Sequence, residues 1–438
     1  MPRLFGTDGV RGLANDYLTP DLAMDLARAA GEGKSGEVLI GRDTRRSGDM
    51  LNAALKAGFN SVGVDTIDLG IIPVGGVSRL TREARALYGI MVSASHNAAP
   101  DNGIKFFSRS GMKISADEEQ AIERRVLAGG PWKSPTGSTI GFDSAKPDAT
   151  DRYVSYLEML AGYSMRGLSV VLDCAHGAAF KAAPQLFAHL KAEIEVHNTS
   201  PDGTNINHEC GATSLEYLQS VADGRLGLAF DGDADRLIAV DEDGVVADGD
   251  VLIAIFAAHL KELGKLTNDT IAVTVMSNLG LHKAMDRLGI KVLTTDVGDR
   301  HVLESMVVNK LSVGGEQSGH VILEERTTGD GLRSGLRLLE VIAASGKPLK
   351  ELRKVMTEYP QVLENVVVAD KAGLDGSSRI WDAVKDAESD MSGDGRILVR
   401  ASGTEPKVRV MVEASDGSTA SQVALQLAEV VKDELGTG

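Results

Sequence analysis

The 438-residue sequence contains few cysteines, few aromatic residues and no long apolar run, and each shortage excludes a class of protein. Cys174 and Cys210 are its two cysteines, so a disulfide-stapled secreted fold is excluded and a reducing compartment is expected. Aromatic residues make up 4%, which argues against an aromatic-lined binding module. The longest strongly apolar run, Val251 to Ala258, is far shorter than the roughly 20 residues that span a bilayer, and the N-terminus lacks an apolar signal core. We therefore expect a cytoplasmic protein with no membrane partner.

Positive charge is also scarce. Lys and Arg number 46 against 62 Asp and Glu, which gives a formal net charge of −16. Such a chain repels a phosphate backbone at long range, so we expect no nucleic-acid partner. An anionic ligand would therefore need a local cluster of Arg and Lys. The 43% of hydrophobic residues excludes a disordered chain, and the length predicts two to four domains at roughly 100–200 residues each.

Apolar segments of strand length alternate with helix-period segments along most of the chain. Strands are expected at 62–67, 168–172 and 194–196, for example, with helices at 48–60 and 178–190. This alternation predicts an α/β fold with helices covering largely parallel sheets. The last 80 or so residues instead follow a β–α–β–β–α order. Polar, Gly- and Pro-containing linkers divide the chain into three α/β domains and a smaller α+β domain, at 1–147, 148–248, 249–360 and 361–438.

The first candidate site follows an apolar strand that begins at Tyr88. The hydroxyl of Ser95 and the imidazole of His96 lie in the loop that follows this strand. The next segment of the chain carries a cationic side chain, Lys105. Loops at strand ends are where α/β folds place reactive groups. A polar turn capped by Ser95 is the structural alternative. A serine hydroxyl is a weak nucleophile, so a function here requires a base or prior phosphorylation.

The second candidate is Asp231-Gly-Asp-Ala-Asp-Arg236, between two apolar runs. The carboxylates of Asp231, Asp233 and Asp235 repel one another unless a cation lies among them, and oxygen ligands favour Mg²⁺ over Zn²⁺. An EF-hand loop also begins D-x-D-x-D. That interpretation fails because Arg236 occupies the sixth position, where the EF-hand requires glycine, and the flanks resemble strands. A solvated acidic turn remains an alternative.

The third candidate is a cationic segment, Arg400-Ala-Ser-Gly-Thr-Glu-Pro-Lys-Val-Arg409, between two predicted strands. One guanidinium group can donate two parallel hydrogen bonds to the oxygens of a phosphate, and hydroxyls and loop N–H groups add further donors. The segment therefore predicts an anion site inside an acidic protein, and a basic surface hairpin is the alternative. Its candidate ligands are Arg400, Ser402, Gly403, Thr404 and Arg409.

Two glycine-rich turns are weaker signals. Gly314-Gly-Glu-Gln-Ser-Gly-His320 presents Glu316, Ser318 and His320, which suit sugar hydroxyls. Phe5-Gly-Thr-Asp-Gly-Val-Arg-Gly12 places Arg11 among small residues. Most such turns are only turns, and a lone arginine is more often a surface charge than a ligand clamp.

Taken together, these five segments resemble the α-D-phosphohexomutase superfamily over nearly the whole chain. They match its N-terminal motif at 5–12, its phosphoserine loop Ser93-Ala-Ser-His-Asn97, its metal loop at 231–236, its sugar loop at 315–320 and its phosphate loop at 400–409, in the same order. The N-terminal motif and Glu-Gln-Ser-Gly-His are most similar to the glucosamine-phosphate branch.

Two departures from the family pattern are visible. Ala98 stands where the family commonly has proline, which loosens the loop without removing a catalytic atom. His176 stands where asparagine is more common, and we assign it no role.

The resemblance implies three similar α/β domains with mixed sheets and a smaller C-terminal α+β domain around a central cleft. It implies that Ser95 carries a phosphoryl group beside one Mg²⁺ per chain, held by Asp231, Asp233, Asp235 and a phosphate oxygen on Ser95. Lys105 and His96 are the candidates for proton transfer, with Arg11 as electrostatic support. The implied substrate-binding residues are Arg236, Asp299, Arg300, Glu316, Ser318, His320, Arg400, Ser402, Gly403, Thr404 and Arg409.

The implied activity is that of an isomerase of amino-sugar metabolism. It interconverts glucosamine 6-phosphate and glucosamine 1-phosphate through a phosphoserine enzyme and a bisphosphorylated sugar. The same chemistry on glucose or mannose phosphate is the nearest alternative. A metal-dependent phosphatase and a catalytically inactive sugar-phosphate sensor are the others. The partner is a small phosphosugar, and a homodimer is possible.

Overall fold

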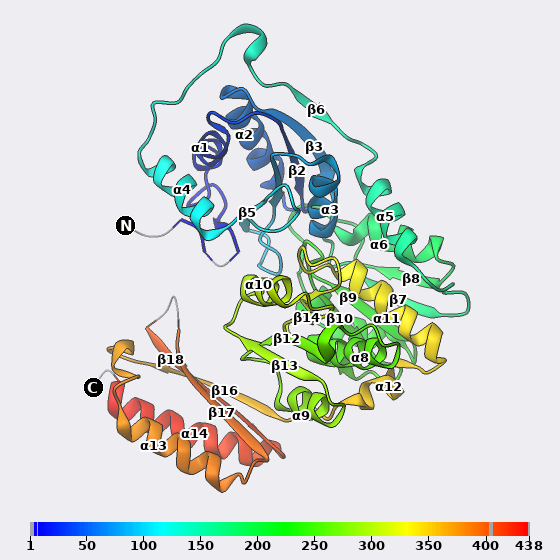
Figure 1. The fold of residues 1–438 in the computed structure, drawn as a ribbon, viewed down its shortest axis with the longest axis vertical. Coiled ribbons are helices and arrows are strands. Elements are labelled where there is room, and N and C mark those ends of the chain that lie inside the picture. Colours follow the sequence, from blue (N-terminus) through cyan, green and yellow to red (C-terminus); the bar gives the residue numbers. More distant parts are fainter. Residues whose placement is uncertain (1–3, 7, 403–405, 437–438) are drawn as a thin grey trace. The chain divides into compact units, whose positions relative to one another are not determined.

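The computed structural model describes residues 4–6, 8–402 and 406–436, and its chain forms two compact units (Figure 1). The larger unit runs to Met276 and continues from Ile290 to Val355. The smaller unit combines Ser277–Gly289 with the chain from Met356 onward.

The larger unit contains three mixed sheets. The first sheet has the strand order β1-β5-β4-β2-β3-β6, with β2 parallel to β3 and β4 and with β5 antiparallel to β4 and β1. Its strands are β1 (Val10–Leu13), β2 (Glu37–Arg42), β3 (Asp65–Ile71), β4 (Tyr88–Val92), β5 (Asp101–Phe107) and β6 (Asp143–Ala145). Its helices are α1 (Pro20–Gly31), α2 (Gly48–Ser61), α3 (Val74–Ala84) and α4 (Ala116–Leu127).

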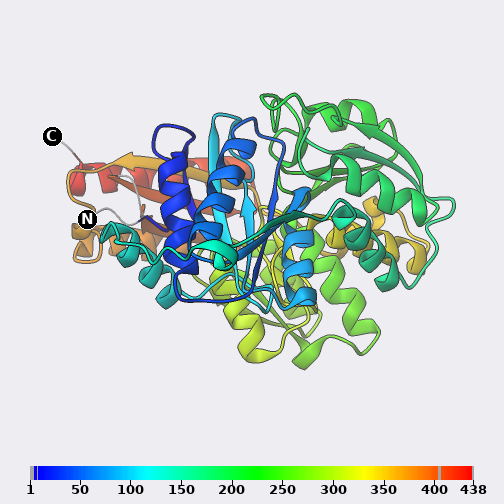
Figure 2. The same cartoon turned by 90° about the horizontal axis from the view of Figure 1, so that it is seen from above.

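Helices cover both faces of this sheet, which explains the continuous apolar composition of its central strands. On one face, α1 and α2 lie side by side (Figure 2) and share a core with Val38 and Ile90. The other face packs against α3 so closely that small residues are required. A Cβ atom on Gly41 would lie 2.6 Å from Val77, and one on Gly89 would lie 2.1 Å from Thr81.

The second and third sheets repeat this layered arrangement. The second has the order β11-β10-β9-β7-β8, and the third has the order β13-β12-β14-β15. The second sheet and its helices comprise β7 (Ser169–Asp173), β8 (Glu193–His197), β9 (Leu226–Phe230), β10 (Leu237–Val240), β11 (Val246–Ala247), α5 (Ala149–Leu160), α6 (Ala179–His189) and α7 (Glu216–Ala222). The third comprises β12 (Thr270–Thr274), β13 (Lys291–Thr295), β14 (Gly314–Gly315), β15 (Val321–Ile322), α8 (Gly249–Glu262), α10 (Asp299–Asn309), α11 (Gly331–Ser345) and α12 (Leu349–Leu352).

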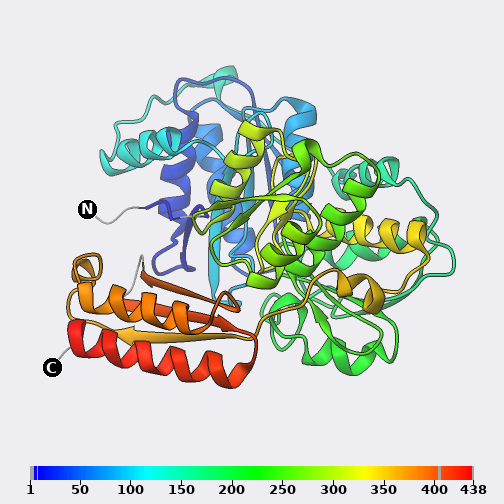
Figure 3. The ribbon, with the colours of Figure 1, turned by 60° about the horizontal axis from the view of Figure 1, so that its bottom comes forward.

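The smaller unit is an antiparallel sheet of order β16-β18-β17, with helices α13 and α14 packed on it (Figure 3). Its elements are β16 (Gln361–Val367), α13 (Ser378–Asp390), β17 (Gly395–Ala401), β18 (Lys407–Ala414) and α14 (Gly417–Leu435). Helix α9 (Leu279–Arg287) also belongs to this unit, although the chain enters it from β12. The side chain of Asn278 bonds the carbonyl and the N–H of Tyr359 at 2.9 and 3.0 Å, and so ties α9 to the start of β16.

The sequence predictions of the fold class and of mixed sheets are confirmed. The predicted strand at 62–67 is wrong in its start, because β3 begins at Asp65. Val62 and Val64 are buried apolar residues on either side of Gly63, which has a φ of +84° in the turn after α2. They therefore contribute to the core and not to the strand. The domain boundaries and the central cleft stay predictions.

Both cysteines are buried free thiols. Among the described helices, none combines the length and the apolar character that crossing a membrane requires.

Candidate active site

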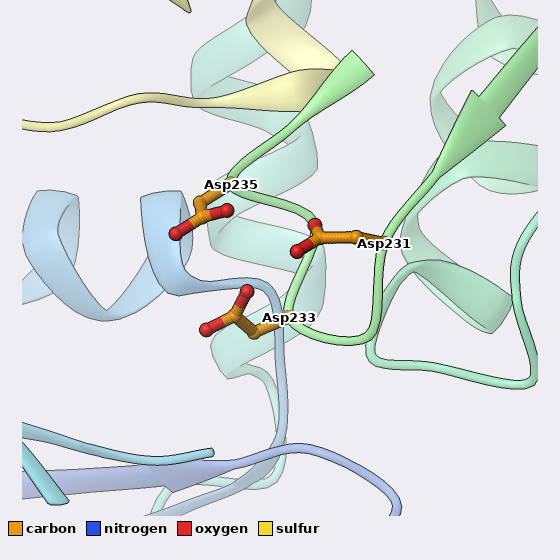
Figure 4. Close-up of side chains that lie close together, drawn as sticks. All are labelled: Asp231, Asp233 and Asp235. Carbon is orange, nitrogen blue, oxygen red and sulfur yellow. The ribbon is translucent and has the colours of Figure 1, made fainter. Parts of the chain in front are cut away.

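The three aspartates lie in the tight turn that connects β9 and β10. Both strands are fully buried, so the polar turn between them lies at the end of the sheet, with Ala234 in a left-handed conformation (φ +59°). Asp231 and Asp233 have no exposed surface, and Asp235 is 5% exposed. One carboxylate oxygen from each lies within 4.8 Å of the others, and the three groups point toward one another (Figure 4).

The charges of this cluster favour a bound cation. Burial, together with Asp235 and Asp233, raises the pKa of Asp231 well above its usual value. Within the described ranges, the buried Oδ1 atom of Asp233 has no hydrogen-bond partner. An all-oxygen donor set with one unsatisfied buried oxygen fits a hard divalent cation such as Mg²⁺.

Ser95 lies directly against this cluster. It follows β4, is 1% exposed, and has a left-handed backbone with a φ of +53°. Its Oγ atom donates to Asp231 Oδ2 at 2.5 Å and lies 3.4 Å from Asp235 Oδ1. The nearby Ser93 instead donates to Asp43 at 2.6 Å. The geometry therefore separates the two serines of the loop, because only the Ser95 hydroxyl contacts the aspartate cluster among the described hydrogen bonds.

Lys105 reaches the same cluster from β5, the antiparallel neighbour of β4. Its Nζ atom lies 2.8 Å from Asp233, 3.2 Å from Asp235 and 3.0 Å from Asp8. Burial alone would lower the pKa of Lys105, but these three carboxylates raise it well above its usual value. The group is therefore a permanent ammonium beside Ser95.

His96 has the opposite electrostatic environment. Its Nδ1 atom lies 3.5 Å from Ser95 Oγ. Burial, with the positive charges of Arg236 and Arg11, lowers the pKa of His96 to about 4. The imidazole next to Ser95 is therefore neutral at physiological pH. The Arg236 guanidinium lies 3.8 Å from Asp235, and Arg11 binds Asp8.

Further polar residues join Lys105 and Asp235 in a closed ring of contacts. Lys113 binds Asp8 and lies 2.5 Å from Asp299. The imidazole of His320 lies 3.5 Å from Asp299 and 3.5 Å from Asp235. Burial alone would lower the pKa of His320, but these aspartates, with Glu316, raise it to about 9. The ring thus connects the aspartate cluster to the turn at 315–320.

The remaining predicted residues of the larger unit lie around that turn. Glu316 Oε1 accepts from the N–H of Gly298, and Ser318 Oγ lies 3.5 Å from Glu316 Oε2. Arg300 is placed differently, because its guanidinium binds Glu119 of α4. Among the described contacts, Arg300 meets none of the three aspartates.

The predicted phosphate site lies in the smaller unit. Arg400 of β17 and Arg409 of β18 are direct cross-strand partners. Burial, together with the charge of Arg409, lowers the pKa of Arg400. Ser402 is buried, and its N–H donates to the carbonyl of Lys407 at 2.8 Å. Gly403 and Thr404 lie outside the described residues.

Several residues of the site were missed by the sequence analysis. They are Asp8, Asp43, Arg45, Lys113 and Asn207. Asp8 contacts Lys105, Lys113 contacts Asp8 and Asp299, and the other three hold the Ser95 loop. For Asp43 and Arg45 a signal was present, because both follow a buried strand. Since β2 and β4 are parallel neighbours, their carboxyl ends meet at one sheet edge, beside Ser95.

Comparison with known proteins covers nearly the whole chain. Four domains described as parts of phosphoglucomutase/phosphomannomutase match in order. Alpha/beta/alpha domains I, II and III match residues 2–130, 151–244 and 248–359, and the C-terminal domain matches residues 363–430. The chain belongs to the phosphoglucomutase/phosphomannomutase family.

Close relatives within this family share one name. A protein of Desulforudis audaxviator called phosphoglucosamine mutase is 49% identical, covering 99% of this chain and 98% of its own. Another of the same name from Moorella thermoacetica is 51% identical, covering 95% and 96%. The predicted superfamily and its assignment to the isomerases are therefore confirmed.

Solved structures of the family share the fold. A phosphoglucomutase/phosphomannomutase family protein of Burkholderia thailandensis superposes with a TM-score of 0.81 at 26% identity, over 99% of this chain and 97% of its own. N-acetylphosphoglucosamine mutase of Aspergillus fumigatus, in complex with GlcNAc-6P and magnesium, superposes with a TM-score of 0.71 at 19% identity, over 99% and 96%. At that identity the second structure supports the fold alone.

Proposed function

We propose that this family member interconverts glucosamine 6-phosphate and glucosamine 1-phosphate, through phosphorylated Ser95 and a bisphosphorylated sugar. The observation that carries the proposal is the 2.5 Å contact of Ser95 Oγ with Asp231, inside a buried carboxylate cluster. The choice of sugar rests on the name shared by relatives at about half identity over the full length. The product would feed amino-sugar nucleotide synthesis in the cytoplasm.

The reaction exchanges one phosphoryl group in two balanced steps. In the first, the bond from phosphorus to Ser95 Oγ breaks, a bond to the free sugar hydroxyl oxygen forms, the hydroxyl proton leaves for a base, and Ser95 Oγ takes up a proton. In the second, Ser95 Oγ loses its proton and forms a bond to the other phosphorus of the reoriented sugar, the bond from that phosphorus to the sugar oxygen breaks, and the departing oxygen takes a proton. Asp231, Asp233 and Asp235, with Ser95, would hold one Mg²⁺. When bound, it would neutralise charge on the phosphoryl oxygens.

His96 and Lys105 have different proposed roles, in proton transfer and in stabilising the charge of the phosphoryl group. His96 is neutral and has a lone pair, so it is our candidate to accept and return the hydroxyl proton. Lys105 remains an ammonium ion and supplies fixed positive charge to the transferring phosphoryl group, with Arg11 behind it.

Substrate recognition is assigned to two groups of residues. Glu316 and Ser318 would hold sugar hydroxyls, with Arg236, Asp299 and His320 around them. The phosphate that does not react would bind Arg400, Ser402, Gly403, Thr404 and Arg409. Arg300 of α10 binds Glu119 of α4. We therefore propose that Arg300 supports the substrate site by joining these two helices and does not contact the substrate directly. A homodimer stays a prediction.

The first experiment tests the nucleophile. Ser95→Ala should lose turnover completely and keep its melting temperature within roughly 3 °C, since the hydroxyl is removed without a change in packing. Intact-mass analysis and peptide mapping of the wild type should find phosphate on Ser95 and none on Ser93. Full activity of the alanine variant, or phosphate mapped to Ser93, would reject the assignment.

A second experiment tests the substrate. We expect the highest kcat/KM for glucosamine phosphate when glucosamine, glucose and mannose phosphates are compared. A preference for glucose or mannose phosphate would replace the proposed sugar and keep the mechanism. Release of inorganic phosphate without isomerised sugar would instead indicate a phosphatase.

A further inference from the structure

We propose that Arg45, supported by Asp43, is a positioning residue for phosphoryl transfer that fixes the backbone of Ser95. The proposal rests on the proposed function, since it assigns Arg45 to the same reaction. Neither residue touches the aspartate cluster in the described contacts. Their effect on the reaction would pass through the loop at 93–97.

A closed ring of hydrogen bonds surrounds the Ser95 backbone. The N–H of Ser95 donates to Ser93 Oγ at 2.8 Å, and Ser93 Oγ donates to Asp43 Oδ2 at 2.6 Å. The same carboxylate oxygen accepts from Arg45 Nε at 2.9 Å, and the guanidinium donates to the carbonyl of Ser95 at 2.9 Å. Both the N–H and the C=O of the nucleophile are therefore held by one closed set of groups.

Arg45 also holds the rest of the loop. Its guanidinium donates to the carbonyls of Asn97 at 2.7 Å and Asp101 at 3.0 Å, and to that of Ala98. The guanidinium has no exposed surface, and its hydrogen bonds reach carbonyls along the whole turn from Ser95 to the start of β5. A planar group with five donors can satisfy such a set of carbonyls, whereas a lysine ammonium has three donors and no fixed plane.

The backbone conformation of Ser95 shows why this restraint is needed. A φ of +53° places Ser95 in the left-handed region, which a side chain with a Cβ atom rarely adopts. Such conformations persist only where surrounding groups determine them, and they occur often at active sites. Without the ring the peptide would relax, and the hydroxyl would turn away from Asp231.

The opposite side of the loop is fixed by Asn207, which lies between β8 and β9, and by the aspartate turn. Asn207 Nδ2 donates to the carbonyl of Ser95 at 2.9 Å and to that of Asn97 at 3.1 Å. A Cβ atom on Gly232 would lie 2.5 Å from the Ser95 carbonyl oxygen, so the loop contacts the backbone of the aspartate turn itself. A shift of the loop on the Arg45 side therefore changes the position of Ser95 Oγ relative to Asp231.

Phosphoryl transfer depends on in-line placement of the reacting atoms, and a displacement of about 1 Å can reduce a rate by roughly 100-fold. A residue that only stabilises the fold would change the fraction of folded enzyme and leave the rate per folded molecule unchanged. These two roles are separable by experiment.

The test uses Ser93→Ala, which opens the ring by removing one small group, and Arg45→Lys, which keeps the charge. Both are compared with Leu26→Ala, a buried core position of the same domain, as the control for lost stability. Melting temperature, kcat, KM and the single-turnover rate of phosphoryl transfer from phospho-Ser95 are measured well below the melting transition.

We expect kcat and the single-turnover rate to fall roughly 10-fold in Ser93→Ala and roughly 100-fold in Arg45→Lys, with KM within about threefold of the wild type. Leu26→Ala should lose stability and keep kcat within about twofold. The proposal is overturned if every loop variant that folds, Ser93→Ala or Arg45→Lys, has the wild-type kcat. A wild-type enzyme that transfers no phosphate from Ser95 to any sugar phosphate would instead overturn the proposed function.

Discussion

Asp231 is the residue whose environment most clearly favours a bound cation. It is buried beside two other carboxylates, and these raise its pKa well above the usual value. Lys105 forms ion pairs with Asp233 and Asp235. Among the described salt bridges, Asp231 has no such ion pair to stabilise its charge. An unpaired buried carboxylate destabilises the folded chain unless it binds a proton or a cation.

This environment predicts opposite effects for Asp231→Asn in the absence and the presence of metal. Without metal, the variant should melt roughly 2 °C higher than the wild type at pH 7.5, because a repelling charge is removed while an acceptor for Ser95 remains. Its Mg²⁺ affinity should fall at least about 100-fold, with loss of turnover. Calorimetric titration and thermal unfolding with and without Mg²⁺ measure both effects.

The control is Asp386→Asn, an exposed aspartate of α13 outside the cluster. This control should leave the melting temperature and the Mg²⁺ affinity unchanged. Equal Mg²⁺ affinity in Asp231→Asn and the wild type would contradict the metal site.

At the scale of elements, one buried contact joins two helices of the larger unit. The hydroxyl of Tyr153 in α5 donates to the carboxylate of Asp330, at 2.7 Å from each oxygen. Asp330 also caps α11 by accepting from the N–H of Arg333 at 3.0 Å. The space is so closed that a Cβ atom on Gly75 would lie 2.1 Å from Asp330 Oδ2. Burial raises the pKa of Asp330 to about 6.

The raised pKa predicts a difference between wild type and Asp330→Asn that depends on pH. The unfolded carboxyl titrates near 3.8, so between pH 6 and 4 the folded protein binds a proton that the unfolded chain does not. This group therefore adds stability as the pH falls, by about 2–3 kcal/mol over that range. Asparagine keeps the cap and does not titrate. The stability of the variant relative to wild type, measured by urea unfolding, should fall from pH 7 to pH 4.5, and a constant difference would refute the assignment.

The β17–β18 hairpin of the smaller unit pairs two like charges at the predicted phosphate site. Arg400 and Arg409 face each other across the two strands, and like charges in that position destabilise a sheet by roughly 0.2–1 kcal/mol. A phosphate bound there, as proposed, would remove this repulsion because it would accept from both guanidinium groups.

Arg400→Gln is therefore expected to raise KM for the sugar phosphate roughly tenfold, with little change in kcat and no loss of thermal stability in phosphate-free buffer. Steady-state kinetics and differential scanning calorimetry measure these quantities. Arg379→Gln, an exposed arginine of the same unit, is the matched control and should keep the wild-type KM. An unchanged KM in Arg400→Gln would argue against the phosphate site.

At the scale of the whole molecule, the chain passes between the two units more than once. Helix α9 lies in sequence between β12 and β13 of the larger unit, yet its contacts are with the smaller unit. The N–H of Leu279 donates to the carboxylate oxygens of Glu413 at 3.3 and 3.2 Å, and Arg396 binds Glu413 at 2.7 Å. The stability of α9 should therefore follow that of a sheet more than 70 residues away in sequence.

Val410→Ala tests this coupling. Val410 is fully buried in the core of the smaller unit, and loss of its two methyl groups should destabilise that unit by about 1–3 kcal/mol. We expect faster hydrogen exchange in 356–436 and also in α9, with β12 and β13 unchanged. Exchange in α9 that remains at the wild-type rate would show that the helix is independent of the smaller unit.

The fold class was accessible from the sequence because alternating strand and helix periods are local properties. The five site motifs were recognisable for a similar reason, since each concentrates its donors within about ten residues. Arg45 shows the limit of this reasoning. It resembles any surface arginine in sequence, and only the pairing of β2 with β4 brings it to the carbonyls of the Ser95 loop.

The sequence by itself determined which chemical groups this protein has available: a serine hydroxyl, three carboxylates at alternate positions and a cluster of arginines. Only the tertiary structure decided that Arg45 holds the Ser95 loop, that Arg300 binds Glu119, and that Asp8 and Lys113 join the site. The physical reason is that composition and spacing are properties of a short segment. Contact, burial and pKa depend on groups that only folding brings within a few ångströms of one another.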